Sequence, residues 1–314
     1  MPDKLLRMRR ATRDGGVRPV MFGLAGDSAA GKTSLTRGIV SALGEDRSVS
    51  ICVDDYHRYD REERKKLPFT PLHPDCNYME VMEQHLQLLA MGQPILKPVY
   101  DHSTGQLVRP ELIEPREFVL VEGLLPLTSK LSRACFDITV YLDPPEEIRR
   151  AWKISRDTGE RGYTAEQVDA ELERREPESA AFIRPQRAFA DVVVRFRTVA
   201  GRDDPPGTPL SAELLLRPTI EHPNLSTAIT DDVNRTVHVK LIRDDDGRPV
   251  DALHVHGHAS PEDSHLVEKA IWDSLGGTDP VPPGLGELRD GQRAEPLAIT
   301  QLVLLAHLLR ESAG

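Results

Sequence analysis

The sequence has few cysteines and no long apolar run, and each shortage excludes a class of protein. Its three cysteines, Cys52, Cys76 and Cys135, have neither paired nor metal-ligand spacing, which argues against a disulfide framework and favours a reduced, cytoplasmic protein. No apolar stretch approaches the roughly 20 residues that span a bilayer. Residues 1–18 read as a short, mobile, basic arm without the apolar core of a secretory signal. We therefore expect no membrane partner.

A surplus of positive charge is also missing, because the 314 residues carry a formal net charge of −10. Nonspecific nucleic-acid binding needs lysine and arginine in excess on one face, so we expect no nucleic-acid partner. Aromatic residues make up 5% of the chain, which leaves little material for a base-stacking pocket. The hydrophobic share of 39% is still enough for a substantial core.

Short apolar runs alternate with longer helical stretches over the first two thirds of the chain. Continuously apolar strands are typical of a parallel sheet buried on both faces, and segments 32–43 and 78–91 are long enough for crossover helices. The pattern predicts an α/β fold with a mostly parallel sheet and helices on both faces, in a domain spanning residues 19–200. The predicted strands are Val20–Ala25, Val49–Val53, Phe118–Glu122, Ile138–Leu142 and Asp191–Phe196.

The character of the chain changes after residue 200. Residues 201–208 are polar and proline-rich and predict a linker. Two β-type runs joined at Asp244–Pro249 predict a hairpin, a helix is expected after Ser260, and a final apolar helix spans about Leu297–Leu309. Residues 201–314 therefore form a small α+β extension, which we expect to add strands to the sheet or to form a contact between subunits.

Residues 26–33 read GDSAAGKT and fit the phosphate-binding loop pattern G-x-x-x-x-G-K-[ST]. The match follows a buried-type strand and opens a helix, as a phosphate cradle of backbone amides requires. Lys32 can reach the β- and γ-phosphates of ATP, and Thr33 can ligate Mg²⁺. Glu122, at the end of an apolar strand, suits a Walker-B acid. The predicted ATP-binding residues here are Gly26, Asp27, Ser28, Ala29, Ala30, Gly31, Lys32, Thr33 and Ser34.

A dense polar group follows the second apolar run. Asp54 is the first acid past that strand and suits the base that deprotonates an acceptor hydroxyl, while His57 and Arg61 could hold the rest of the acceptor. Such a group is also common in a solvated loop, and the residues alone do not decide between the two. His102, a single loop histidine, carries little signal of its own.

A basic helix provides the third group. Lys153, Arg156 and Asp157 share one helical face, and Arg161 lies at or just beyond its end. A helix of this kind, followed by a glycine-containing turn, is typical of a lid that closes over a triphosphate. An exposed helix with ordinary ion pairs is the alternative, since several glutamates lie nearby.

These motifs together resemble the phosphoribulokinase family, within the wider uridine-kinase-like group of P-loop kinases. The resemblance runs from about Met21 to Asp191 and rests on GLAGDSAAGKT, DDYHRYDR, KPVYDHSTG, FVLVEGLLPL and AWKISRDTGERG. It implies ATP- and Mg²⁺-dependent phosphorylation of ribulose 5-phosphate at its C1 hydroxyl, with a homodimer favoured.

The resemblance also implies roles for single residues. Asp54 is the implied catalytic base, with Lys32, Glu122, Arg156 and Asp157 in the catalytic group. Thr33, Glu122 and Asp54 are the implied metal ligands, and Arg161 and Arg187 join the ATP site. The implied sugar-phosphate ligands are His57, Arg61, Tyr100, His102, Lys153, Arg174 and Arg175.

Two further features qualify this reading. Redox-regulated plant members carry one cysteine in the phosphate loop and another just before the catalytic aspartate. Here Ala30 occupies the first position and Cys52 the second, so no such disulfide is expected. Alternation places His254, His256 and His258 on one strand face, which could bind a metal but more simply forms an exposed polar face.

Two other functions compete with this one. A kinase of the same fold could act on another pentose, pentose phosphate or nucleoside. A regulatory GTPase is less well supported, because the sequence has no N-K-x-D motif.

Overall fold

A computed structural model describes residues 18–198, 209–223, 225, 229, 237–275, 277, 280–288 and 291–313. The predicted arm lies outside the described residues except for Arg18, whose guanidinium pairs with Asp137 at 3.4 Å. The predicted linker at 201–208 also lies outside them.

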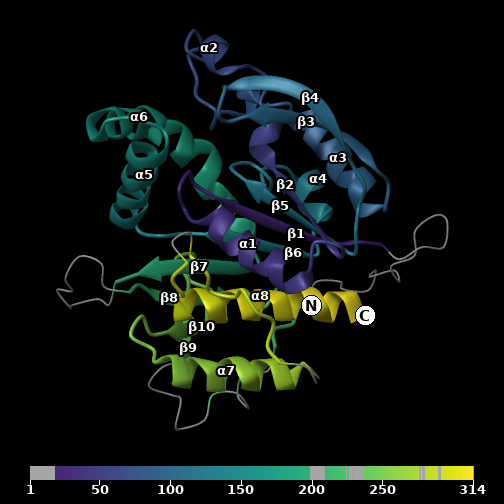
Figure 1. Ribbon diagram of the computed structural model, residues 1–314, viewed down its shortest axis with the longest axis vertical. Helices are drawn as coiled ribbons and strands as arrows, with labels where there is room; N and C mark the ends of the chain where they lie inside the picture. The colour runs from purple at the N-terminus through teal and green to yellow at the C-terminus, as the bar shows by residue number, and fades with distance from the viewer. Residues whose placement is uncertain are drawn as a thin grey trace.

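An eight-stranded sheet in the order β2-β5-β1-β6-β7-β8-β10-β9 forms the centre of the molecule (Figure 1). The five strands at the β2 end are parallel, and the other three run antiparallel. The five predicted apolar runs are the five parallel strands, so the predicted α/β fold is confirmed. In chain order the strands are β1 (Val20–Gly26), β2 (Ser48–Cys52), β5 (Phe118–Gly123), β6 (Ile138–Leu142), β7 (Val192–Arg197), β8 (Ser211–Leu216), β9 (Val237–Arg243) and β10 (Pro249–Val255).

Helices cover both faces of this sheet. Phe22 and Leu24 of β1 pack into the core shared with α1 (Lys32–Leu43), α7 (Pro261–Ser274) and α8 (Glu295–Ala313). Met21 and Ala25 point the other way, into the core shared with α3 (Met79–Ala90). The short α4 (Lys130–Ala134) lies beside α3. Because both faces of β1 are buried, every position in the strand is apolar or glycine.

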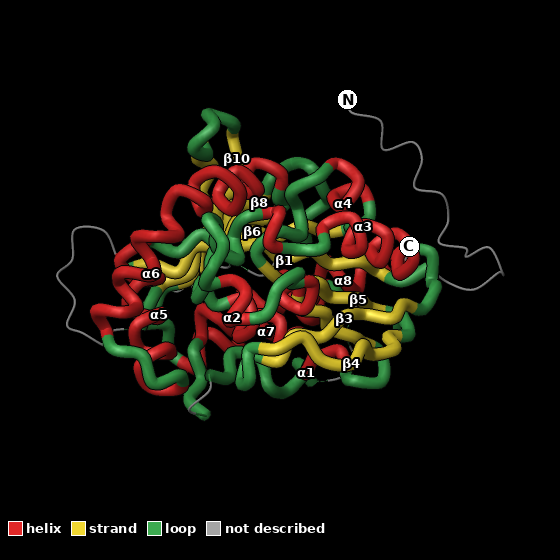
Figure 2. The backbone as a smooth tube through the Cα atoms, turned by 90° about the horizontal axis from the view of Figure 1, so that it is seen from above, coloured by secondary structure: helices red, strands yellow, loops and turns green. Residues whose placement is uncertain are grey.

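Three smaller units stand above the edge of the sheet where the parallel strands end (Figures 1 and 2). The helical pair α5 (Glu146–Glu160) and α6 (Ala165–Glu178) lies on one side. A two-stranded sheet, β3 (Ile95–Asp101) and β4 (Gln106–Ile113), lies on the other, with α2 (Arg61–Arg64) between them. Short turns η1 (Val53–Tyr56), η2 (Pro74–Cys76), η3 (Ser179–Ile183) and η4 (Arg184–Phe189) complete the described elements.

The structure corrects the expectation for the three histidines. Strand β10 ends at Val255, so His254 lies in the strand whereas His256 and His258 belong to the turn that follows. The His254 ring stacks on His238 of β9, with centroids 4.9 Å apart. The turn bends the chain away before the alternation can continue, and the three side chains share no strand face.

Helix α8 of the extension braces the helix that follows the phosphate-binding loop. Gln301 is fully buried, and its amide nitrogen donates to the carbonyls of Ser34 and Leu35 at 3.0 and 3.3 Å. Its amide oxygen accepts from the Gly286 N–H at 2.6 Å. Gly38 of α1 lies against this amide, and a Cβ there would come within 2.2 Å of the Gln301 nitrogen. The extension therefore helps to hold in place the helix that follows the phosphate-binding loop.

We expect Gly38→Ala to destabilise the protein, although alanine normally stabilises a helix by about 1 kcal/mol relative to glycine. Gln301 cannot withdraw without breaking its three hydrogen bonds, and overpacking of this kind costs about 1–3 kcal/mol. Gly159→Ala in α5 is the matched control, since nothing lies within 4 Å of its added Cβ. Thermal unfolding should show a lower Tm for the first variant and an equal or higher Tm for the second. A stabilised Gly38→Ala protein would contradict this packing.

Candidate functional site

The phosphate-binding loop, Asp54 and Glu122 meet at one edge of the sheet because the strands that carry them are neighbours. β5 lies between β1 and β2, and Glu122 pairs in register with Leu24 on one side and Cys52 on the other. Asp54 follows two residues beyond Cys52, in η1. In open α/β sheets, ligands bind beyond the carboxyl ends of the strands, and this edge is such a place.

The loop between β1 and α1 adopts the strained backbone of a phosphate cradle. Ala29 has φ of 64°, the one positive value found at a non-glycine position among the described residues, and Gly31 has φ of 97°. No side chain of the described residues caps α1, so its first N–H groups face the loop. The Lys32 ammonium donates to the carbonyls of Gly26 and Asp27, each at 2.9 Å. Loop amides, helix start and ammonium together fit a polyphosphate.

Thr33 and Glu122 form an oxygen pair beside this loop. The Thr33 hydroxyl donates to the Glu122 carboxylate at 3.2 Å. Burial raises the pKa of Glu122, although Lys32 and the Thr33 hydroxyl oppose that effect. A hydroxyl and a carboxylate are the hard oxygen donors that Mg²⁺ accepts, so these residues fit the predicted metal. The place of Asp54 in the metal set stays a prediction.

Asp27 connects the loop to the elements above it, a role that the sequence did not predict. Its carboxylate accepts the Ser28 N–H at 2.7 Å and the hydroxyl of Ser179 in η3. Arg149 of α5 lies 3.5 Å from the same carboxylate and donates to the Ser28 carbonyl at 3.2 Å. The loop is thus tied to both ends of the α5–α6 pair.

The structure separates the roles of the two adjacent acids after β2. Asp55 accepts the Tyr100 N–H at 3.0 Å and pairs with the buried Lys97 ammonium, so it anchors β3. Asp54 makes no such anchor. Burial raises the pKa of Asp54, but His57 and His102 in their protonated forms and the permanent cations Lys32 and Arg175 lower it by more, so the net pKa is below its ordinary value. Asp54 is therefore ionised at neutral pH and lies near the loop lysine.

His57 is buried and its tautomer is fixed by its neighbour. Asn77 donates through its amide nitrogen to the carbonyls of Pro71 and His73, so its oxygen must accept from the His57 Nδ1–H at 2.7 Å. Nε2 of His57 then carries a lone pair. Burial lowers the pKa of His57 to about 4, and the ring is neutral at pH 7. His57 can accept a hydrogen bond from a hydroxyl.

The β3–β4 hairpin brings further predicted residues to this region. His102 is half exposed, with its Nε2 3.9 Å from the Asp54 carboxylate. Arg61 donates to the His102 carbonyl and so supports the hairpin turn. The Tyr100 hydroxyl accepts from Arg64, whose guanidinium lies 4.6 Å from the Tyr100 ring centroid.

Asp157 is the centre of the basic group on α5. It is buried and pairs with Lys153 at 2.7 Å and Arg156 at 2.8 Å, and Arg161 lies 3.5 Å away. Burial raises its pKa, but the hydrogen bonds from Arg156 and Lys153 lower it by more. Lys153 is also buried, which lowers its pKa. Lys153 and Asp157 thus share a helical face as predicted, and each neutralises the charge of the other.

The paired arginines of α6 have different surroundings. Arg174 is exposed, whereas Arg175 is half-buried and pairs with Glu171. Among the described residues, Arg175 Nε and Arg64 Nη1 are buried nitrogens without a hydrogen-bond partner. Burial raises the pKa of Cys76 to about 11. Arg64 and Arg175 lower this pKa, which indicates that both guanidinium groups lie near the Cys76 thiol. Two guanidinium groups that each keep one nitrogen without a partner fit an anionic ligand. Arg64 was missed from the sequence, although it lies three residues after Arg61 on the same turn.

Arg187 occupies a different place. It donates to Asp143 at 2.9 Å and to Asp244 at 2.7 Å, and so joins the end of β6 to the extension. A cavity of about 670 Å³ lies next to it, beside the start of α5. Its charged lining includes Asp143, Glu146, Arg150, Arg184, Arg195 and Arg197.

Comparison with known proteins agrees with this geometry. The sequence profile of the Phosphoribulokinase / Uridine kinase family matches residues 21–200. This chain belongs to that family. It is 43% identical over 178 residues to a phosphoribulokinase from Synechocystis, covering 57% of this chain and 54% of that protein. With a chloroplastic phosphoribulokinase from Triticum aestivum it shares 36% over 222 residues, covering 65% and 55%.

The chain spans about half the length of these phosphoribulokinases. A uridine kinase from Chloroflexus aurantiacus is 35% identical over 181 residues, covering 56% of this chain and 86% of that kinase. The solved structure of phosphoribulokinase from Rhodobacter spheroides superposes with a TM-score of 0.57 at 17% identity, covering 82% of this chain and 99% of that one. This last match supports the fold alone.

The buried neutral His57 predicts a pH dependence of stability. Its pKa is about 4 in the folded protein against 6.5 in the unfolded chain, so between these values the unfolded chain binds more protons. The free energy of unfolding therefore falls as the pH falls through this window. Between pH 7 and pH 5, His57 should account for a loss of about 2 kcal/mol.

Urea unfolding of the wild type and of His57→Gln at both pH values checks this contribution. His307, whose pKa burial also lowers to about 4, contributes to both proteins equally. The wild type should lose about 2 kcal/mol more than the variant on acidification. Equal losses would mean that His57 titrates normally in the folded state.

Proposed function

We propose that this protein transfers the γ-phosphate of ATP to the C1 hydroxyl of ribulose 5-phosphate, giving ribulose 1,5-bisphosphate and ADP. The observation that carries the proposal is the ionised Asp54, which lies near Lys32 of the phosphate-binding loop and near Arg175, whose Nε lacks a hydrogen-bond partner. A loop for a polyphosphate, a base and cations for a second anion are the parts that such a transfer needs.

On the donor side, the loop amides and Lys32 hold the phosphates of ATP. The cavity beside α5 is within the size range of small-molecule sites, and the start of the same helix reaches the loop through Arg149, which donates to the Ser28 carbonyl. We place the nucleoside of ATP there. Thr33 and Glu122 would hold Mg²⁺, which neutralises charge on the transferring phosphoryl group when bound.

On the acceptor side, Arg64 and Arg175 hold the phosphate of ribulose 5-phosphate through the nitrogens that lack partners. His57 accepts a hydrogen bond from a sugar hydroxyl through Nε2. The half-exposed His102 lies 3.9 Å from Asp54 and could contact the same sugar. These contacts orient the acceptor hydroxyl toward the loop, which is the larger part of catalysis in phosphoryl transfer.

Asp54 supplies the proton chemistry. As the C1 oxygen bonds to the γ-phosphorus, Asp54 accepts the proton that this oxygen loses, and the bond from the γ-phosphorus to ADP breaks. Asp157 acts indirectly, because it holds Arg156 and Arg161 in the lid above the loop. The α5–α6 pair can then exclude water when it closes.

Uridine is the second candidate acceptor, favoured by the family relative named uridine kinase, of which the chain covers 86%. The ring of Tyr100 contacts His57 and His102 edge-on, and the Arg64 guanidinium lies over it. The nitrogens of Arg64 and Arg175 that lack partners favour a phosphorylated acceptor over uridine.

We also propose a cytosolic setting, since the three cysteines are all free. No helix in the described part of the chain is long and apolar enough to cross a bilayer. Assembly as a dimer stays a prediction of the sequence.

The test is ADP release measured with ribulose 5-phosphate, ribose 5-phosphate, free pentoses and uridine as acceptors. We expect turnover to be fastest with ribulose 5-phosphate and weak with free pentoses, which cannot pair with the arginines. Turnover confined to uridine would overturn the proposed acceptor.

A pair of neighbouring variants checks the phosphate site in the same assay. Arg175→Gln should raise the KM for ribulose 5-phosphate at least about tenfold, since a lost charge-assisted hydrogen bond costs roughly 1.5–3 kcal/mol. Arg174→Gln, on the exposed face of the same helix, should leave the KM within about twofold. Equal effects of the two variants would remove Arg175 from this site.

A further inference from the structure

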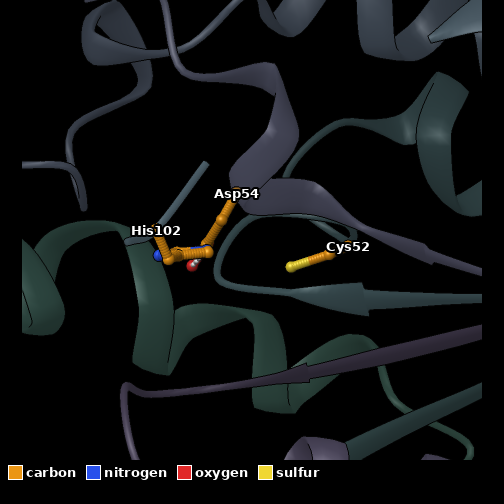
Figure 3. A group of neighbouring side chains, drawn as sticks. All are labelled: Cys52, Asp54 and His102. Atoms are coloured by element: carbon orange, nitrogen blue, oxygen red, sulfur yellow. Dashed lines mark ion pairs between the residues drawn. The ribbon is translucent and has the colours of Figure 1, made fainter. Parts of the chain in front are cut away.

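Three side chains of different chemistry converge beside the phosphate-binding loop (Figure 3). Cys52 at the end of β2, Asp54 in η1 and His102 in the β3–β4 turn each offer one ligand atom, and these atoms all lie within 4.8 Å of one another. The Asp54 and His102 side chains point toward each other, and the Cys52 sulfur points into the same space. Among the described residues, this is the one group found in which at least three histidine, cysteine or acidic side chains lie close enough to share a metal ion.

The donor set distinguishes among metals. One thiolate, one imidazole and one carboxylate match the ligands of Zn²⁺, whereas Mg²⁺ prefers oxygen alone. Bond lengths in tetrahedral zinc sites separate neighbouring ligand atoms by about 3.5 Å. His102 Nε2 and the Asp54 carboxylate are already 3.9 Å apart, and the His102 side chain is 50% exposed. A small rotation of this ring completes a three-ligand site with a fourth position open to water.

The surroundings of the cluster favour a cation. The Asp54 carboxylate belongs to the cluster, and Glu122 pairs in register with Cys52 on the neighbouring strand. Carboxylates in these positions attract a divalent ion, which replaces the proton of the thiol. Lys32, the nearest cation on the loop, is engaged by the carbonyls of Gly26 and Asp27.

We propose that Cys52, Asp54 and His102 bind Zn²⁺, and that the bound ion inhibits phosphoryl transfer by occupying the Asp54 carboxylate. The binding stands on the cluster alone, whereas the inhibition rests on the function proposed above. On binding, the Cys52 S–H bond breaks, the sulfur electron pair forms the metal bond, and the proton passes to solvent. No oxidant or reductant takes part.

Co²⁺ is the probe for binding, because a thiolate bound to it gives a sulfur-to-cobalt charge-transfer absorption. Titrating the full chain with Co²⁺ in the absence of ATP should produce this band at one equivalent, and Zn²⁺ should abolish it. Cys52→Ser should lose the band and weaken Zn²⁺ binding at least about tenfold, and His102→Ala should weaken it similarly. Cys135→Ser is the matched control and should leave both signals unchanged, since Cys135 lies in the core near α4.

A charge-transfer band that survives in Cys52→Ser, or unchanged Zn²⁺ affinity in both Cys52→Ser and His102→Ala, would overturn the site. Failure of the kinase proposal would leave the Co²⁺ titration unaffected, so the two outcomes are distinguishable.

In the kinase assay, with free Zn²⁺ buffered and Mg²⁺-ATP in excess, Cys52→Ser should raise the inhibitory Zn²⁺ concentration at least about tenfold. Equal inhibition of Cys52→Ser and the wild type would overturn the regulatory half of the proposal.

Discussion

Asp54 must stay ionised while half-buried, and the arrangement of the site follows from this electrostatic constraint. A carboxylate at this depth loses hydration, which raises its pKa. The positive charges of Lys32 from the loop and Arg175 from α6 compensate at neutral pH. These two groups come from separate parts of the chain, so the charge of Asp54 depends on the correct placement of both the loop and α6. Glu122, with less compensation, has a raised pKa one strand away.

The same loop is held from two further directions. Asp27 connects it to Ser179 and to Arg149, at the two ends of the α5–α6 pair. Gln301 of α8 fixes the first turns of α1 from the opposite side. Movement of the lid or loosening of the extension would therefore reach the phosphate cradle directly. This explains why residues far along the chain contribute to a phosphate cradle formed by residues 26–33.

Much of this could be predicted from the sequence where the signal was local. The parallel strands were visible because they form short, mostly apolar runs, of which β1 is buried on both faces, and α1 was predicted over its observed span, 32–43. Strands β3 and β4 were missed because most β4 side chains are exposed and form no apolar run. Pairing between strands is not local, so the sequence could not tell that Asp55 anchors β3 and leaves Asp54 available. His256 and His258 were misplaced because alternation does not indicate where a strand ends.

Proton transfer from the acceptor hydroxyl to Asp54 is best tested by comparing Asp54→Asn with Asp55→Asn. Both substitutions remove one charge from adjacent positions, so general electrostatic effects are matched. We predict that kcat falls at least about 10²-fold in Asp54→Asn while the Kd for ATP is retained, because a general base contributes on this scale. Asp55→Asn should lower the Tm, through loss of the Lys97 pair, with a much smaller change in kcat. Near-normal turnover by Asp54→Asn would show that Asp54 is not the base.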